Sequence, residues 1–163
     1  MGFVSRLTKF IKDDISTPEG FFKGEDFEKY VREHLFTKSK YILLGKTHDY
    51  KSNKGDYIQN TKEPDLKLRS IKSKKEFFVE AKYRARYYED AVEWCKPFQL
   101  TRYKAIDKQI PVYIALAVGN EPSSPRQIFF LPVKDIKYTK LFRSFLKKYE
   151  VSIDRPIDDS LLQ

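Results

Sequence analysis

An unbroken apolar run at residues 112–118 is the feature that most restricts what this chain can fold into. A strand with one solvated face alternates polar and apolar side chains, whereas a strand covered on both faces is apolar throughout. Pro111 directly precedes the run, at a position where a missing backbone N–H costs little. We therefore expect residues 112–118 to form a buried central strand.

The spacing of apolar residues predicts the elements around this strand. Residues 24–36 have helical spacing, with a core stripe at Phe27, Tyr30, Val31 and Leu35. Residues 138–149 also read as an amphipathic helix, and Pro97 suits the first position of a helix through Asp107. Strands are predicted at residues 41–44, 66–71, 76–82 and 127–131, and the polar tetrad 72–75 suits a hairpin turn. With the central strand, the order is α-β-β-β-α-β-β-α, which predicts an α/β protein.

The 163 residues and the hydrophobic content of 40% fit one folded domain. Residues 3–15 read as a basic amphipathic helix followed by a break at residues 16–20. We expect an N-terminal helix and linker at 1–19, the main domain at 20–150 and a polar C-terminal tail at 151–163. The first helix could dock on the main domain or on a membrane surface, and the first alternative is favoured.

The charge balance favours a polyanionic partner without identifying it. Lys and Arg total 32 against 23 Asp and Glu, so the formal net charge is +9. Such a charge suits nucleic acid, but basic proteins also arise for solubility or for contact with membranes. A single cysteine, Cys95, excludes an internal disulfide. With no secretory signal and no apolar run long enough to span a bilayer, the expected location is the cytoplasm.

Three residues near the hairpin predict a metal site. Glu80 and Lys82 lie two apart on one strand, so their side chains share a face. If the turn centres on Ser73 and Lys74, Asp65 lies opposite Lys82 and diagonal to Glu80. Hard divalent ions take one or two carboxylates plus waters, so this arrangement is typical of a Mg²⁺ site.

These residues resemble the motif of the PD-(D/E)xK nuclease superfamily, which has the restriction-endonuclease-like fold. Pro64-Asp65 begins one strand, and Glu80-Ala81-Lys82 follows on the next. The resemblance implies a three-layer core in which a mixed central sheet is flanked by helices. It also implies that Asp65 and Glu80 bind Mg²⁺ or Mn²⁺, that the backbone carbonyl of Ala81 adds a ligand, and that Lys82 assists the attacking water.

Two further features resemble small nucleases of the Holliday junction resolvase type. Glu28 lies beside the core residue Phe27, where those proteins turn a glutamate toward the metal. Gln99 and Tyr103 match a Q-x-x-x-Y element that borders the active site in several members, in which Gln99 would contact phosphate or the lysine. The resemblance extends roughly over residues 20–135, an extent typical of a single domain.

The leading hypothesis is a metal-dependent endonuclease acting on DNA, and a homodimer would let two sites reach two strands. One alternative is a non-catalytic nucleic-acid-binding module of the same fold, and another is an interaction protein that docks through the N-terminal helix. No Walker loop, glycine-rich dinucleotide fingerprint or Ser-His-Asp arrangement is recognisable. The cations expected near the centre are Lys72, Lys74, Lys75, Arg84, Arg86, Arg102 and Lys104.

Overall fold

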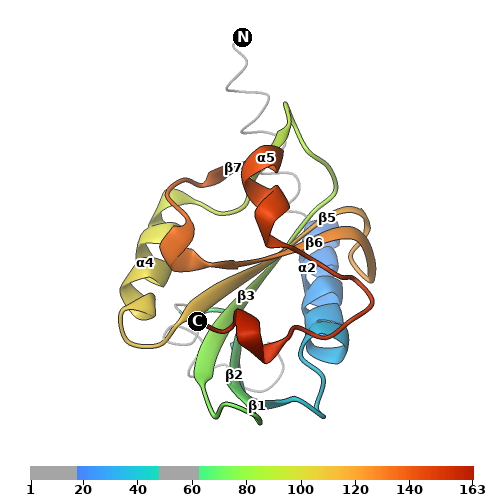
Figure 1. Ribbon diagram of the computed structural model, residues 1–163. Helices are drawn as coiled ribbons and strands as arrows, with labels where there is room; N and C mark the ends of the chain where they lie inside the picture. Colours follow the sequence, from blue (N-terminus) through green and yellow to red (C-terminus); the bar gives the residue numbers. More distant parts are fainter. Residues whose placement is uncertain (1–17, 48–62) are drawn as a thin grey trace.

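The computed structural model describes residues 18–47 and 63–163, so the predicted N-terminal helix and most of the predicted 46–62 loop lie outside it. The described chain is built on a six-stranded mixed sheet in the order β1-β2-β3-β5-β6-β8 (Figure 1). Only β3 and β5 pair in parallel in this sheet. Its strands are β1 (Tyr41–Lys46), β2 (Leu66–Ser70), β3 (Glu76–Arg84), β5 (Val112–Glu121), β6 (Ser124–Pro132) and β8 (Glu150–Val151).

The predicted central strand is confirmed. β5 lies between β3 and β6, and its residues 112–118 are all buried. Because side chains alternate along a strand, β5 contributes to two separate cores. Tyr113 and Ala115 pack on one face of the sheet, and Ile114 and Leu116 pack on the other.

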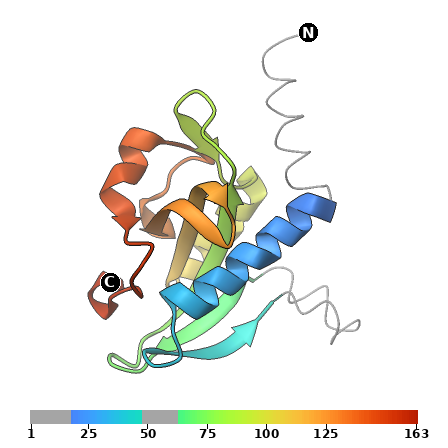
Figure 2. The same ribbon diagram turned by 90° about the vertical axis from the view of Figure 1, so that its right-hand side faces the viewer.

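One face of the sheet is covered by α2 (Pro18–Tyr30), which continues into a π-helical turn, η1 (Val31–Leu35) (Figure 2). Phe27, Val31 and Leu35 are fully buried there as predicted, whereas Tyr30, the fourth residue of the predicted stripe, is half-buried. The expected break at residues 16–20 is partly wrong, because Pro18 already begins the helix. Proline is tolerated in the first helical turn, where its missing N–H would have no helical partner.

The other face is covered by α4 (Pro97–Asp107) and by a two-stranded ribbon of β4 (Ala91–Glu93) and β7 (Lys140–Phe142). The α4 bounds agree with the prediction. Helices therefore lie on both faces of a mixed sheet, which confirms the predicted α/β three-layer class. None of the helices in the described part of the chain has the length and apolar character needed to cross a bilayer.

The predicted helix at 138–149 is wrong. This segment forms β7, the single helical turn α5 (Arg143–Leu146) and a 3-10 turn (Lys147–Tyr149). Leu141 and Leu146 are buried, but Phe142 is 50% exposed rather than on a shared apolar face. The physical reason is the ladder between β4 and β7, in which Val92 pairs with Leu141 and takes up backbone groups that a helix would use.

Residues 151–163, expected to be a polar tail, pack on the domain. Ile157 and Leu162 are buried in the same core as α2. The backbone N–H of Ile157 donates to the carbonyl of Leu35 (2.9 Å), and the Tyr41 hydroxyl donates to the Ile157 carbonyl (2.7 Å). Ile157 and Leu162 lie five residues apart, a spacing typical of neither a helix face nor a strand face, so the sequence pattern could not reveal this packing.

Candidate active site

Asp65 and Glu80 meet at the open end of the β2–β3 hairpin. Leu66 pairs with Val79 and Arg69 with Glu76, so continuing the ladder by one pair sets Asp65 opposite Glu80. The predicted pairing of Asp65 with Lys82 is therefore wrong by two residues. The turn centres one residue earlier than expected, as the Ser70 N–H donates to the Lys75 carbonyl (2.9 Å). A shift of two residues keeps every side chain on its face, so the carboxylates still converge.

Hydrogen bonds and an ion pair connect the predicted residues. The backbone N–H of Ala81 donates to Oδ2 of Asp65 (2.8 Å), and the Asp65 N–H donates to Oε2 of Glu80 (3.2 Å). Lys82 Nζ lies 2.7 Å from Oε1 of Glu80. The two acids and the amine predicted from sequence thus form one cluster, which we call the acid–lysine cluster (Asp65, Glu80 and Lys82).

Burial makes this cluster electrostatically crowded. Asp65 and Glu80 are 7% and 3% exposed. Burial raises the pKa of Asp65 well above its usual value, and the negative charge of Glu80 raises it further, against the opposing effect of Lys82. Burial alone would lower the pKa of Lys82, but the carboxylates of Glu80 and Asp65 outweigh it and the pKa is raised. Lys82 therefore remains an ammonium, and its charge does not offset the effects of burial and of Glu80 on Asp65.

Glu28 reaches the border of the cluster from α2. It is buried, and its Oε1 lies 3.4 Å from Lys46 Nζ and 3.9 Å from Arg32 Nε. Burial raises the pKa of Glu28 despite the positive charges of Lys46 and Arg32, and the charge of Glu80 contributes to the rise. Sequence reasoning missed Lys46, which pairs with Leu66 in the ladder and so lies beside Asp65 in the sheet. Only the pairing of β1 with β2 reveals it.

The two residues of the predicted Q-x-x-x-Y element, Gln99 and Tyr103, have different partners on α4. Tyr103 is buried, and its pKa is raised by burial, by the charges of Glu80 and Asp65, and by a hydrogen bond with Glu80. Gln99 instead uses its amide oxygen to accept the backbone N–H of Lys96 (2.9 Å) at the start of the helix. In this arrangement Tyr103 faces the acid–lysine cluster and Gln99 caps the helix.

The lysines of the hairpin turn are not near the cluster, contrary to expectation. Ser70 is five residue steps along the chain from Asp65, which corresponds to about 17 Å along an extended strand. Lys72, Lys74 and Lys75 lie beyond Ser70, and Nζ of Lys75 donates to the backbone carbonyl of Leu162 (2.6 Å). This end of the hairpin anchors the C-terminal residues.

The two expected arginines Arg84 and Arg102 differ in their surroundings. Arg84 donates to the backbone carbonyls of Glu93 (2.7 Å), Tyr83 (2.8 Å) and Trp94 (2.8 Å), so it ties β3 to β4. Arg102 on α4 lies over the ring of Phe98, 5.5 Å from its centroid. Among the remaining expected cations, Arg86 is exposed and Lys104 is half-buried.

The donor set suits a small divalent cation of the Mg²⁺ type. Such ions bind through one or two carboxylates plus waters, and Asp65 and Glu80 supply two carboxylates beside the Ala81 backbone. Burial and the charge of Glu80 raise the pKa of Asp65 despite Lys82, so a further positive charge beside it would favour its ionised form. Within residues 18–47 and 63–163, no three Asp, Glu, His or Cys side chains gather closely enough to form a metal site by themselves. Any ion held here would keep several waters.

The architecture is similar to that of a solved Holliday junction resolvase, Hjc from the archaeal hyperthermophile Archaeoglobus fulgidus. The TM-score is 0.51, with 16% sequence identity over 80% of this chain and 92% of that chain. This chain has the restriction-endonuclease-like fold. That confirms the resemblance seen in the sequence at the level of the fold. No protein-family model and no curated protein matches the sequence.

Proposed function

We propose that this protein is a metal-dependent endonuclease that cleaves DNA at the acid–lysine cluster. One observation carries the proposal: two buried carboxylates, Asp65 and Glu80, lie side by side with Lys82 2.7 Å from Glu80, in a fold shared with a Holliday junction resolvase. Burying such charges is unfavourable unless a cation compensates them, and structural roles rarely require it.

Asp65 and Glu80 would hold Mg²⁺ or Mn²⁺, with the Ala81 carbonyl as a further ligand. The bound ion would neutralise charge on the scissile phosphate and lower the pKa of a water. The Ala81 N–H orients the Asp65 carboxylate, and the Tyr103 hydroxyl, kept protonated by its raised pKa, orients Glu80. Lys82 is an ammonium rather than a base, so it would position the water and stabilise negative charge on the phosphate.

The nature of the substrate is inferred from charge and from the fold. The net charge of +9 favours a polyanion, and the resolvase of similar fold takes its name from a DNA junction. A non-catalytic nucleic-acid-binding module would have the same charge, but it has no need of two crowded carboxylates.

The test is incubation of the purified protein with supercoiled, linear, single-stranded and branched DNA, and with RNA, in Mg²⁺, Mn²⁺ or chelator. We expect cleavage of DNA that requires the metal and is lost in Asp65→Ala. The matched control is Glu76→Gln on β3, a half-buried carboxylate that pairs with Arg69 four residues before Glu80, and this variant should cleave as the wild type does. Cleavage that persists in chelator or in Asp65→Ala would refute the proposal. DNA binding without cleavage under any of these conditions would support the binding module instead.

A further inference from the structure

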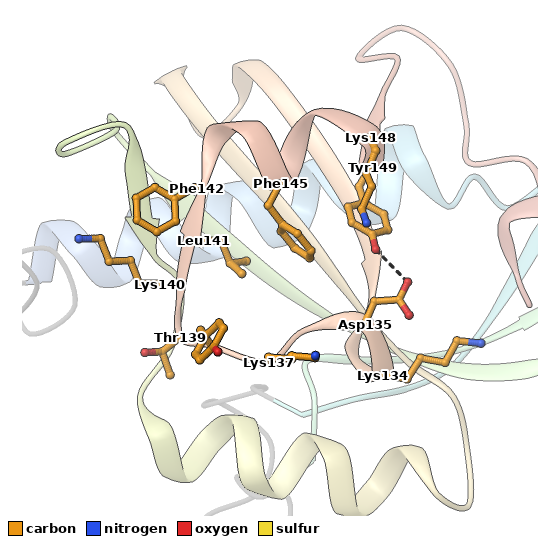
Figure 3. Close-up of a pocket in the computed structure, with 11 residues that line it drawn as sticks. Lys134, Asp135, Lys137, Thr139, Lys140, Leu141, Phe142, Phe145, Lys148 and Tyr149 are labelled. Atoms are coloured by element: carbon orange, nitrogen blue, oxygen red, sulfur yellow. Dashed lines mark hydrogen bonds between the residues drawn. The ribbon is translucent and has the colours of Figure 1, made fainter.

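A broad groove opens between the β7–α5 segment and the loop before it (Figure 3). Its volume is about 1050 Å³, which is enough for a ligand larger than a single ion. We call it the lysine–aromatic groove and define it by Lys137, Tyr138, Lys140, Phe142, Phe145 and Lys148. Nothing in the proposed catalytic role uses these residues.

The aromatic rings of the groove are accessible to a ligand. Tyr138 is 71% exposed and Phe142 is 50% exposed. Exposed rings that lie together in one patch, unlike single rings scattered over a surface, are typical of a binding site. Neither ring packs in the core, so both are available for stacking.

The charge of the groove selects an anionic occupant. Lys134, Lys137, Lys140 and Lys148 line it together with a single acid, Asp135, whose Oδ2 accepts the Tyr149 hydroxyl (2.9 Å). A basic peptide would be repelled. The occupant should therefore carry negative charge.

Lysines and rings alternate at short distances. Lys140 Nζ lies 5.4 Å from the ring centroid of Phe142, and Lys148 Nζ lies 5.0 Å from those of Phe145 and Tyr149. A nucleic-acid strand also alternates flat bases with phosphates along its length. Proteins that bind single strands combine cations along the backbone with aromatic side chains that stack on bases.

The groove adjoins the candidate active site through two residues. Trp94 donates its backbone N–H to the Thr139 carbonyl (3.0 Å) and its indole N–H to the Tyr138 carbonyl (3.2 Å). The next residue, Cys95, is buried and lies within electrostatic reach of Lys82 and Glu80. Groove and cluster thus lie on the same side of the sheet, on either side of Trp94 and Cys95.

We infer that the lysine–aromatic groove holds a single-stranded stretch of the nucleic acid that the proposed endonuclease cleaves, an inference that rests on the proposed function. Bases stack on Tyr138 and Phe142, and the surrounding lysines contact phosphates. A duplex cannot occupy the groove in this way, because its bases are stacked on one another and do not present their faces. The groove would therefore favour substrates with an unpaired segment beside the cleavage point.

The first test measures binding of a fluorescein-labelled oligothymidylate of about 12 nucleotides, a length within the range of single-strand sites. Binding is followed by anisotropy with the full chain in chelator, so no cleavage occurs. The double variant Tyr138→Ala/Phe142→Ala should bind at least about tenfold more weakly, as expected for the loss of two stacking contacts. Phe22→Ala on α2, which removes a ring that is 61% exposed, should bind as the wild type does.

A second test separates the lysines from the rings. Lys140→Gln and Lys148→Gln should each reduce the slope of log K against log salt by about 0.7, the value for one phosphate contact on a single strand. The control Lys108→Gln removes an exposed charge that does not line the groove and should leave the slope unchanged. All of these side chains are outside the acid–lysine cluster.

Two results would overturn the inference: unchanged affinity in the double variant, or a wild type that binds polyglutamate but not the oligonucleotide. Cleavage of DNA in Mn²⁺, measured in parallel, separates this outcome from failure of the proposed function. Ring-dependent binding without cleavage would retain the groove and reject the enzyme. Cleavage with ring-independent binding would reject the groove alone.

Discussion

The two ends of the β2–β3 hairpin hold carboxylates in opposite electrostatic conditions. At the open end, burial and the charge of Glu80 raise the pKa of Asp65. At the turn end, Asp159 accepts hydrogen bonds from the hydroxyls of Ser70 and Ser73, and these bonds lower its pKa. The same chemical group is thus disfavoured as an anion at one end and stabilised as an anion at the other.

This difference suggests distinct roles for the carboxylates at the two ends of the hairpin. Asp159 has its partners within the chain, so its carboxylate attaches the C-terminal residues to the hairpin. Asp65 and Glu80 are buried side by side, so in the proposed function a bound cation would stabilise their negative charges. In the proposed function, the crowded, buried acids bind the metal, whereas Asp159 makes a structural contact.

The largest expected effect lies at the open end. Glu80→Gln should lower the rate of DNA cleavage by about 100-fold or more, because the amide is a poor ligand for the metal and carries no charge. Asp159→Asn, the equivalent change at the turn end, should leave the rate within about twofold of the wild type. The measurement is single-turnover cleavage at saturating Mn²⁺. Equal losses in both variants would contradict the division between the two ends.

The next effect is on stability at the turn end. Asp159→Ala should lower the free energy of unfolding by about 1–2 kcal/mol, because the hydroxyls of Ser70 and Ser73 lose a charged acceptor. Since the folded pKa of Asp159 is lowered, this contribution is present above the unfolded pKa and is lost as the pH falls through the folded value. Urea denaturation at pH 7 and pH 3 measures it, with exposed Glu33→Ala as the control. An unchanged midpoint at pH 7 would show that Ile157 and Leu162 alone hold the segment.

A smaller effect tests whether Glu28 supports metal binding at the acid–lysine cluster. Glu28→Gln should raise the Mn²⁺ concentration needed for half-maximal cleavage by about tenfold, a typical result for a residue that supports a metal site from its border. The rate at saturating Mn²⁺ should change less. If the metal requirement is unaltered, Glu28 serves only to pair with Lys46 and Arg32.

The smallest expected effect is a gain in stability. Asp65→Asn keeps an oxygen that accepts the Ala81 N–H but removes a buried charge, so it should stabilise the metal-free protein at pH 7.5 by on the order of 1 kcal/mol. Because the folded pKa of Asp65 is raised, the contribution of this group to stability is fully present below its unfolded pKa and is lost as the pH rises through the folded value.

Thermal melts at pH 4.5 and 7.5 compare the two proteins, and the gain should be smaller at pH 4.5. Mg²⁺ should raise the melting temperature of the wild type and not that of Asp65→Asn. A variant that is less stable than the wild type at pH 7.5 would show that the charge of Asp65 is already compensated within the chain.

Local patterns predicted most of the core and the composition of the cluster. The apolar run at 112–118, the stripe at Phe27, Val31 and Leu35, and the start of α4 at Pro97 depend on neighbours in the sequence, and all are confirmed. The segment 138–149 has apolar spacing compatible with a helix, yet β4 pairs with part of it as a strand. The position of the hairpin turn was missed by one residue because several polar residues there suit a turn equally well.

By itself, the sequence determined which residues share a face, because the alternation of side chains along a strand is a local property that survives a shift of two residues. That is why Asp65, Glu80 and Lys82 could be grouped in advance. Only the tertiary structure decided their pairing, their burial and the direction of the pKa shifts. The lysine–aromatic groove also depends on the tertiary structure. These properties depend on contacts between residues far apart in the chain, which no local pattern records.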